Sequence, residues 1–223
     1  MSSSFSRRDI GSLSLGAAAI LSGLQATPSL AQGKPPEEGL DYIKLNKPAP
    51  TEAPKDKIEV VEFFWYGCPH CNAFEPQLEA WLKVLPKDVH FRHSPAAFRA
   101  EWVPQQHLYF TLEALNLVDV LHKRVFYAIH VEKINLTTRE QIMAWIPKQA
   151  IKGLDMAKFT QTFDSFNVGS KATRATQLQQ AYNVDGVPSL GVAGQFITDG
   201  GKAQGMERAL RIVNALVNGQ RKK

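Results

Sequence analysis

Residues 63–71 read Phe63-Phe64-Trp65-Tyr66-Gly67-Cys68-Pro69-His70-Cys71, and they hold the only two cysteines of the chain. A β-branched and aromatic run, residues 58–65, precedes the pair, as in a buried central strand. A segment of helical periodicity, residues 72–85, follows it. Two cysteines at this spacing, at the start of a helix, can form a small disulfide ring and open it again. We therefore expect a strand–CxxC–helix unit that performs thiol–disulfide exchange.

The remaining pattern predicts an α/β protein with a helical insertion. Residues 89–93 form a second strand candidate, which completes a βαβ unit with the cysteines at the carboxyl end of its first strand. From about 100 to 182 only amphipathic helix is predicted, and Thr137-Thr138-Arg139-Glu140 indicates a capping box there. Strand character returns at 187–193 and 195–198, which should pair as a hairpin, and a helix is predicted over 202–217. An edge strand is expected within 41–45.

The N-terminus has the features of a signal peptide. Arg7 and Arg8 precede an apolar run at 10–24, and Ser29-Leu30-Ala31 offers small residues for cleavage. The run of about 15 residues is shorter than the roughly 20 that span a bilayer, although an uncleaved anchor is the alternative. Either the general or the twin-arginine export route delivers the chain outside the cytoplasm, and we expect the periplasm, an oxidising compartment.

Composition narrows the function classes. The chain is 44% apolar and 21% charged, as in an ordinary globular protein. Its net charge of +5 is modest and scattered, so it gives no reason to expect nucleic-acid binding. A single cysteine pair in a chain of 223 residues is not a disulfide scaffold, because the core is large enough to fold alone.

The order of residues within the motif suggests roles for each. Cys68 lies at the expected helix N-terminus, where unpaired N–H groups and the helix dipole favour a thiolate, so it is the candidate nucleophile. Cys71 is the resolving partner, and His70, if protonated, adds positive charge. Pro69 suits the first helical turn. A stabilised thiolate favours the reduced form, which makes the Cys68–Cys71 disulfide an oxidant.

Two other interpretations of the cysteines stay open: a static disulfide, or half of a metal site. No His pair at the usual zinc-ligand spacing follows Cys71 at a useful distance, so no metal and no cofactor are expected. His90, His93, His107, His122 and His130 have no partner that the sequence identifies, and solvated or core roles are expected for them.

Several segments resemble the DsbA family: Glu62-Phe63-Phe64, Cys68-Pro69-His70-Cys71, Phe74-Glu75, Gly186-Val187-Pro188, and Tyr42, Leu45 and Lys47-Pro48 near the N-terminus. The resemblance covers about residues 40–218. It implies a thioredoxin fold with an inserted all-helical subdomain, and a periplasmic dithiol oxidase. The corresponding division is a signal peptide (1–31), an N-terminal tail and edge strand (32–57), a first thioredoxin-like part with the CPHC site (58–99), a helical insertion (100–182), and a second thioredoxin-like part (183–223).

The resemblance also implies further site residues. Pro188 would be a cis-proline beside the disulfide, and the Val187 backbone would pair with an extended substrate. Glu62, if buried, would relay a proton near Cys71, the alternative being a carboxylate turned to solvent. The family's companion lysine has no match at 87–92. Trp65 and Tyr66 are core residues or border a peptide groove.

The sequence thus predicts an enzyme that donates its disulfide to newly exported, reduced, unfolded proteins. The resemblance implies reoxidation by a membrane quinone-coupled partner similar to DsbB, and we expect a monomer. A reductase or isomerase of the same fold is one alternative. A non-catalytic peptide- or metal-binding module is the other.

Overall fold

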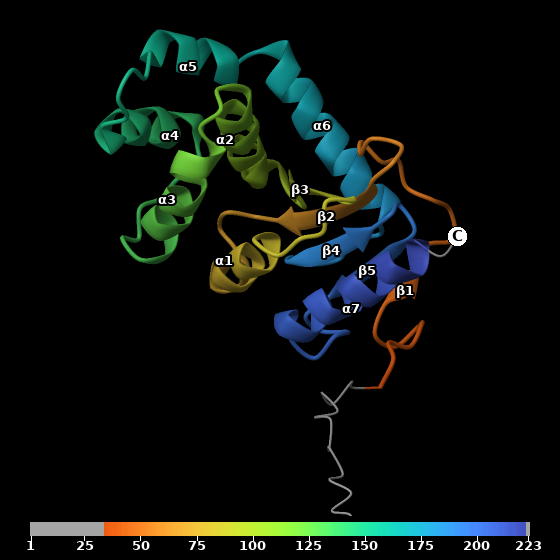
Figure 1. Cartoon of the computed structure of the whole chain (residues 1–223). Coiled ribbons are helices and arrows are strands. Elements are labelled where there is room, and N and C mark those ends of the chain that lie inside the picture. Colours follow the sequence, from red (N-terminus) through yellow and green to blue (C-terminus); the bar gives the residue numbers. More distant parts are fainter. Residues whose placement is uncertain (1–33, 222–223) are drawn as a thin grey trace, which may run out of the picture. The chain divides into compact units, whose positions relative to one another are not determined.

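The structure is a computed structural model that describes residues 34–221. From Pro35 onward the chain forms one compact unit (Figure 1). The signal peptide expected at 1–31 lies outside the described residues. None of the described helices is long and apolar enough to cross a membrane.

A five-stranded mixed sheet lies at the centre, in the order β1-β5-β4-β2-β3. The strands are β1 (Ile43–Lys44), β2 (Ile58–Phe64), β3 (Val89–Pro95), β4 (Ser189–Val192) and β5 (Phe196–Asp199). β2 pairs in parallel with β3 and antiparallel with β4, and every residue of β2 after its first is buried. The predicted central strand, the short edge strand and the β4–β5 hairpin are therefore confirmed.

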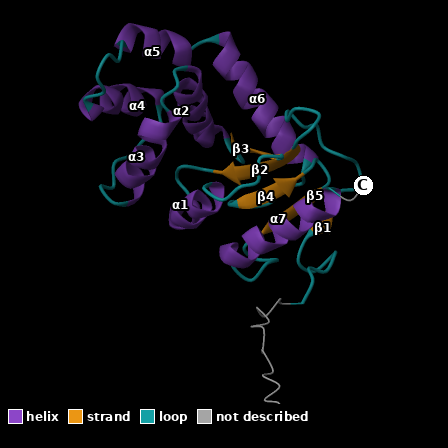
Figure 2. Ribbon diagram, in the orientation of Figure 1, coloured by secondary structure: helices purple, strands orange, loops and turns teal. Residues whose placement is uncertain are grey.

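Two helices cover one face of this sheet (Figure 2). They are α1 (Pro69–Leu82), which follows β2 directly, and α7 (Met206–Gln220), which ends the described chain. Val60 of β2 packs in one apolar cluster with Leu78 of α1 and Val213 of α7. This cluster fixes α1 against the sheet, and so it fixes the CxxC turn at the carboxyl end of β2.

The chain between β3 and β4 is helical, as the periodicity predicts. Its elements are the 3₁₀ turns η1 (Ala100–Trp102) and η2 (Ile146–Gln149), and the helices α2 (Val103–Ala114), α3 (Val118–His130), α4 (Arg139–Trp145), α5 (Met156–Phe163) and α6 (Phe166–Ala181). A large apolar cluster joins these helices and includes Phe64 and Tyr66 beside the cysteines. The end of α6 returns to the sheet, where Leu178 and Tyr182 pack with Phe63. The insertion therefore rests on the sheet next to the CxxC turn (Figure 1).

The capping box of α4 lies one residue later than the sequence pattern indicates. Thr138, not Thr137, is the N-cap, and its hydroxyl accepts the backbone N–H of Gln141. The Gln141 side chain in turn accepts the backbone N–H of Thr138 at 3.0 Å. The prediction with Glu140 as the reciprocal partner is wrong because Gln141 satisfies the same requirement one position on.

Candidate active site

The two cysteines lie where β2 ends and α1 begins. Cys68 is the N-cap of α1 and Pro69 occupies the first turn, where its missing N–H costs nothing. The backbone N–H of Cys71 donates to Cys68 Sγ at 3.3 Å, so a free helix-terminal donor is aimed at the sulfur. Both cysteines are free thiols. Cys68 keeps 6% of its surface exposed and Cys71 none.

The pKa values of the two thiols shift in opposite directions. The pKa of Cys68 is lowered to about 6, chiefly by the hydrogen bond from the Cys71 side chain and also by backbone N–H groups and the charge of His70. The pKa of Cys71 is raised, chiefly by burial and further by its bond to Cys68 and the nearby Glu62 carboxylate. These shifts favour a thiolate at Cys68 near neutral pH and a thiol at Cys71, which is the arrangement expected for an attacking and a resolving sulfur.

A loop 119 positions further along the chain completes the surroundings of Cys68. The Val187–Pro188 peptide bond is cis. Cys68 Sγ lies 3.3 Å from the Val187 carbonyl oxygen and donates to it when Cys68 is a protonated thiol. Val187 is half-buried and Pro188 is buried. The Val187–Pro188 loop therefore lies against Cys68 Sγ and presents backbone groups beside this sulfur.

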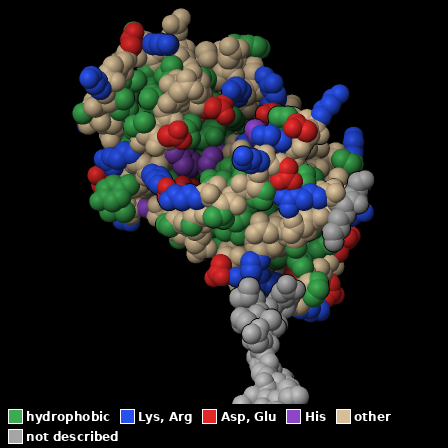
Figure 3. Space-filling model, in the orientation of Figure 1, with side chains coloured by type: hydrophobic (Ala, Val, Ile, Leu, Met, Phe, Trp, Pro, Cys, Tyr) green, Lys and Arg blue, Asp and Glu red, His purple; other side chains and the backbone are tan. Residues whose placement is uncertain are grey.

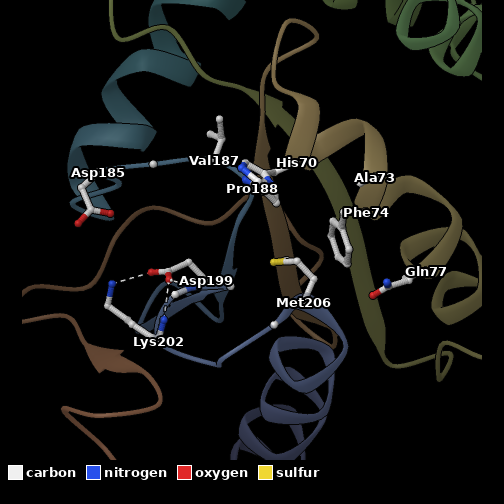
Figure 4. A pocket seen from close by; sticks show the side chains of 14 residues that line it. His70, Ala73, Phe74, Gln77, Asp185, Val187, Pro188, Asp199, Lys202 and Met206 are labelled. Carbon is white, nitrogen blue, oxygen red and sulfur yellow. Dashed lines mark hydrogen bonds and ion pairs between the residues drawn. The ribbon is translucent and has the colours of Figure 1, made fainter. Parts of the chain in front are cut away.

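A groove of about 770 Å³ opens beside this loop (Figure 4). His70 and Phe74 of α1 line one side, and the Val187–Pro188 loop and Met206 line others. Asp199 and Lys202 form an ion pair of 2.6 Å at its far edge. His70 is exposed at the groove and Pro69 is exposed next to it. The groove thus extends from the apolar side chains of Phe74 and Met206 to the CxxC turn.

Glu62 is fully buried, so the alternative of a solvent-facing carboxylate is excluded. Its Oε2 lies 2.7 Å from Nδ1 of His93, its cross-strand neighbour in β3. Burial raises the pKa of Glu62, although the bond to His93 acts in the opposite direction. The charge of Glu62 also contributes to the raised pKa of Cys71. A buried acid of this kind can hold a proton near neutral pH.

The sequence did not identify the polar groups that surround Glu62. The ring centroids of His93 and His122 are 4.8 Å apart, and the Tyr66 hydroxyl contacts His122 Nδ1 at 2.9 Å. His122 Nε2 lies 3.5 Å from Glu75, without hydrogen-bond alignment. The parallel register of β2 and β3 sets His93 beside Glu62, and the sequence pattern does not reveal that register. The contacts that His122 of α3 makes are non-local, so the sequence pattern does not predict them.

The two aromatic residues before the cysteines differ in their surroundings. Tyr66 is 1% exposed and belongs to the core, so it does not border a groove. Trp65 is partly exposed and stacks on Trp102 with the ring centroids 3.7 Å apart. Of the remaining histidines, His130 contacts the Tyr66 carbonyl and His107 that of Phe163. Across residues 34–221 no three His, Cys, Asp or Glu side chains gather as metal ligands would.

The chain has a thioredoxin fold with a helical insertion. It carries a stabilised thiolate at a helix N-terminus, a buried second thiol and an opposing cis-proline loop. Together these features define a thiol–disulfide oxidoreductase. A family model for the DSBA-like thioredoxin domain matches residues 101–211. The chain is 40% identical over 206 residues to the thiol:disulfide interchange protein DsbA of Pseudomonas aeruginosa, an alignment that covers 91% of this chain and 96% of that protein. It is 41% identical over 200 residues to DsbA of Bordetella parapertussis, with 89% and 93% covered.

Solved structures agree with these relatives. The crystal structure of Pseudomonas aeruginosa DsbA superposes with a TM-score of 0.77 at 40% identity, over 83% of this chain and 95% of that one. An oxidoreductase from Neisseria meningitidis gives a TM-score of 0.72 at 26% identity, over 83% and 94%. The chain belongs to the DsbA family of thiol:disulfide interchange proteins.

Proposed function

We propose that this protein donates its Cys68–Cys71 disulfide to thiols of newly exported proteins in the periplasm. The observation that carries the direction of transfer is the opposite shift of the two thiol pKa values. A stabilised Cys68 thiolate lowers the free energy of the reduced protein, and the disulfide then tends to be given away. In a dedicated reductase the thiolate would be less stabilised, so the disulfide would be the more stable form.

Each reaction cycle moves one disulfide. A substrate thiolate attacks Cys68 Sγ, the Cys68–Cys71 bond breaks, and Cys71 Sγ leaves with the electron pair and takes a proton. A second thiolate of the substrate then attacks the substrate sulfur of the mixed disulfide. Cys68 is released as a thiolate. The substrate has lost two electrons and the protein has gained them. Glu62, buried near Cys71 with a raised pKa, is the proposed source of the proton.

The loop at Val187–Pro188 and the adjoining groove are the proposed substrate site. The Val187 carbonyl already faces Cys68 Sγ, so an extended peptide that pairs with this backbone holds its cysteine at the reacting sulfur. The apolar floor formed by Phe74 and Met206 suits the side chains that unfolded polypeptides expose. His70 lines the groove next to Pro69, and its charge contributes to the lowered pKa of Cys68.

The cellular partners follow from the electron balance. Every transfer leaves the protein as a dithiol, so an oxidant must restore the disulfide, and a membrane quinone-coupled partner similar to DsbB is proposed for that role. Periplasmic location rests on the signal features of residues 1–31. We also propose a monomer, and the division into parts at 58–99, 100–182 and 183–223.

The decisive experiment compares single cysteine variants in oxidation of a reduced, unfolded model protein. Cys68→Ser should abolish oxidation, because the Cys68–Cys71 disulfide that the substrate attacks can no longer form. In the complementary assay, reduced Cys71→Ser is mixed with a disulfide-bonded substrate, and its Cys68 thiolate should accumulate as a mixed disulfide, because the resolving thiol is missing. Unchanged activity in Cys68→Ser would overturn the assignment.

A further inference from the structure

The groove beside the Val187–Pro188 loop carries its fixed charges on one side. The titratable side chains that line it are His70, Asp185, Asp199 and Lys202. His70 belongs to the CxxC turn, whereas Figure 4 shows the other three across the groove from α1. The charge that a bound peptide meets on the side opposite α1 is therefore set by Asp185, Asp199 and Lys202.

Asp199 and Lys202 neutralise each other. Lys202 Nζ lies 2.6 Å from Asp199 Oδ2, and Asp199 Oδ1 accepts the backbone N–H groups of Gly201 and Lys202 at 2.8 and 2.9 Å. The bond to Asp199 raises the pKa of Lys202, so the ammonium group stays charged within the pair. The pair contributes one charge of each sign, which leaves the charge of Asp185 without a counter-ion of its own.

Asp185 is exposed, and its carboxylate forms no hydrogen bond or ion pair with the other residues of 34–221. The main chain on both sides of it is held in place. Val184 is buried and donates its N–H to the Gln179 carbonyl at 3.0 Å, and the Ser189 hydroxyl donates to the Gly186 carbonyl at 2.7 Å. The groove therefore has one uncompensated negative charge on a backbone that is fixed beside it.

This charge lies within reach of a peptide that is joined to Cys68. The Val187 carbonyl oxygen is 3.3 Å from Cys68 Sγ, and Asp185 precedes Val187 by two residues. Consecutive Cα atoms are 3.8 Å apart, so the Cα atoms of residues 185 and 187 are separated by at most about 7.6 Å. An extended peptide advances by about 3.3 Å per residue. A side chain two or three positions from the substrate cysteine therefore spans the distance to Asp185.

We propose that Asp185 selects substrates that carry Lys or Arg two or three positions from the reacting cysteine, on the side of the peptide that lies toward this residue. The inference rests on the proposed function, because it names the substrate class of that same site. An exposed ion pair contributes little energy, so Asp185 ranks substrates and does not admit or exclude them.

The charge of the whole chain acts in the opposite direction. Its net charge is +5, and Lys and Arg side chains are spread over the face of the molecule that Figure 3 shows. The overall field therefore disfavours a basic peptide. A preference for basic peptides can come only from a local negative charge.

An equilibrium between two mixed disulfides measures this preference. Cys71→Ser, with Cys68 joined to 2-mercaptoethanol, is mixed with peptides that contain one cysteine and either Lys or Glu two or three positions before or after it. The peptide thiol replaces 2-mercaptoethanol on Cys68, so one disulfide is exchanged for another and nothing is oxidised overall. Mass spectrometry after an acid quench gives the equilibrium constant. The same peptides with bis(2-hydroxyethyl) disulfide, a small neutral disulfide, correct for the intrinsic reactivity of each thiol.

On one side of the cysteine, the Lys peptide should be bound about fivefold more favourably than the Glu peptide at low salt. The ratio should approach one in about 0.5 M salt, because salt screens exposed charges. Asp185→Asn should bring the ratio close to one at low salt, and Asp185→Lys should reverse it. A general defect of the groove would weaken both peptides alike and leave their ratio unchanged.

The neighbouring ion pair allows a graded test. Lys202→Gln removes the charge that offsets Asp199 and should increase the preference for Lys. Asp199→Asn keeps an oxygen for the two backbone N–H groups but uncovers the charge of Lys202, and it should lower the preference. Asp56→Asn is the matched control, because Asp56 is exposed in the turn before β2 and does not line the groove, and its ratio should equal that of the unaltered groove.

Three results would overturn the proposal: no preference for Lys, an equal preference on both sides of the cysteine, or a preference that survives in folded Asp185→Asn. The exchange does not depend on the direction of electron transfer. If the unaltered protein failed to oxidise a reduced, unfolded protein while the Lys preference was present, the proposed function would fall and the charge selection would stand. If oxidation took place without the preference, only the charge selection would fall.

Discussion

The chemistry of this protein depends on two sulfur atoms in one turn that experience different surroundings. Cys68 caps a helix and receives hydrogen bonds, whereas Cys71 is fully buried and is influenced by the charge of Glu62. The first surroundings stabilise a negative charge and the second oppose it. The same four-residue motif therefore contains both a stabilised thiolate and a thiol with a raised pKa, which loses its proton less readily.

At this scale the first prediction concerns the thiolate. Replacing Cys71 by Ala should raise the pKa of Cys68 above its value of about 6, because the largest stabilising contribution is the bond from the Cys71 side chain. The rise should be partial, since the backbone N–H of residue 71 stays in place. Ultraviolet absorbance of the thiolate against pH measures it. Cys71→Ser retains a donor and should shift less, and equal shifts in both variants would contradict this account.

Single residues also mark the limit of prediction from sequence. The roles of Cys68 and Cys71 follow from spacing and a helix terminus, which are local, and the structure gives the two thiols the environments that those roles need. The contacts of His93 and His122 depend on how α3 packs against the sheet, which no local pattern encodes. Glu62 lies between these cases, since its burial was one of two alternatives that the sequence offered and its partner His93 was not predicted.

Among the elements, α4 begins at a pair of adjacent threonines that only the structure distinguishes. Thr138→Ala should lower the free energy of unfolding by about 1 kcal/mol, because it removes the N-cap acceptor of the Gln141 N–H. Thr137→Ala is the matched control and should cost less, since the Thr137 hydroxyl contacts only side chains. Urea unfolding of both variants measures the difference. A greater loss in Thr137→Ala would restore the capping box that the sequence pattern indicated.

A second prediction at the scale of the elements concerns how tightly β4 packs against its neighbours. A Cβ at Gly191 would lie 2.4 Å from the Tyr182 ring and 2.8 Å from Val61, so Gly191→Ala should destabilise by about 1–3 kcal/mol. Gly169 in α6 has open space, and Gly169→Ala should be neutral or stabilising by up to about 1 kcal/mol. Thermal unfolding of the two variants compares them. A neutral Gly191→Ala would mean that Tyr182 moves aside freely.

At the scale of the whole molecule, the sheet-containing part and the helical insertion have different structural roles. The sheet with α1 and α7 fixes the CxxC turn, and the insertion packs on Phe64 and Tyr66 behind it. The alternation of strands and helices made this architecture predictable in outline. The placement of the 187–188 loop on Cys68 was implied only by a resemblance, because it joins residues 119 positions apart.

The lowered pKa of Cys68 also links folding stability to pH. A thiol whose pKa falls from its ordinary value near 8.5 to about 6 stabilises the folded reduced protein as pH rises through this window, by roughly 1–2 kcal/mol at pH 7, and the gain is lost below about pH 6. Above about pH 8.5 the raised pKa of Cys71 opposes further gain. Denaturant unfolding of the reduced and disulfide forms should show a difference that changes with pH. A constant difference would contradict the thiolate assignment.

The central claim is that the Cys68–Cys71 disulfide is poised to be donated. Its most direct test is the equilibrium of the cysteine pair with a glutathione redox buffer, read from the fraction of protein that remains a dithiol. We predict that the pair stays largely reduced even in mixtures rich in oxidised glutathione, because the Cys68 thiolate stabilises the dithiol form. A pair that becomes oxidised at low fractions of oxidised glutathione would indicate a reductant, and a pair that does not exchange at all would indicate a static disulfide.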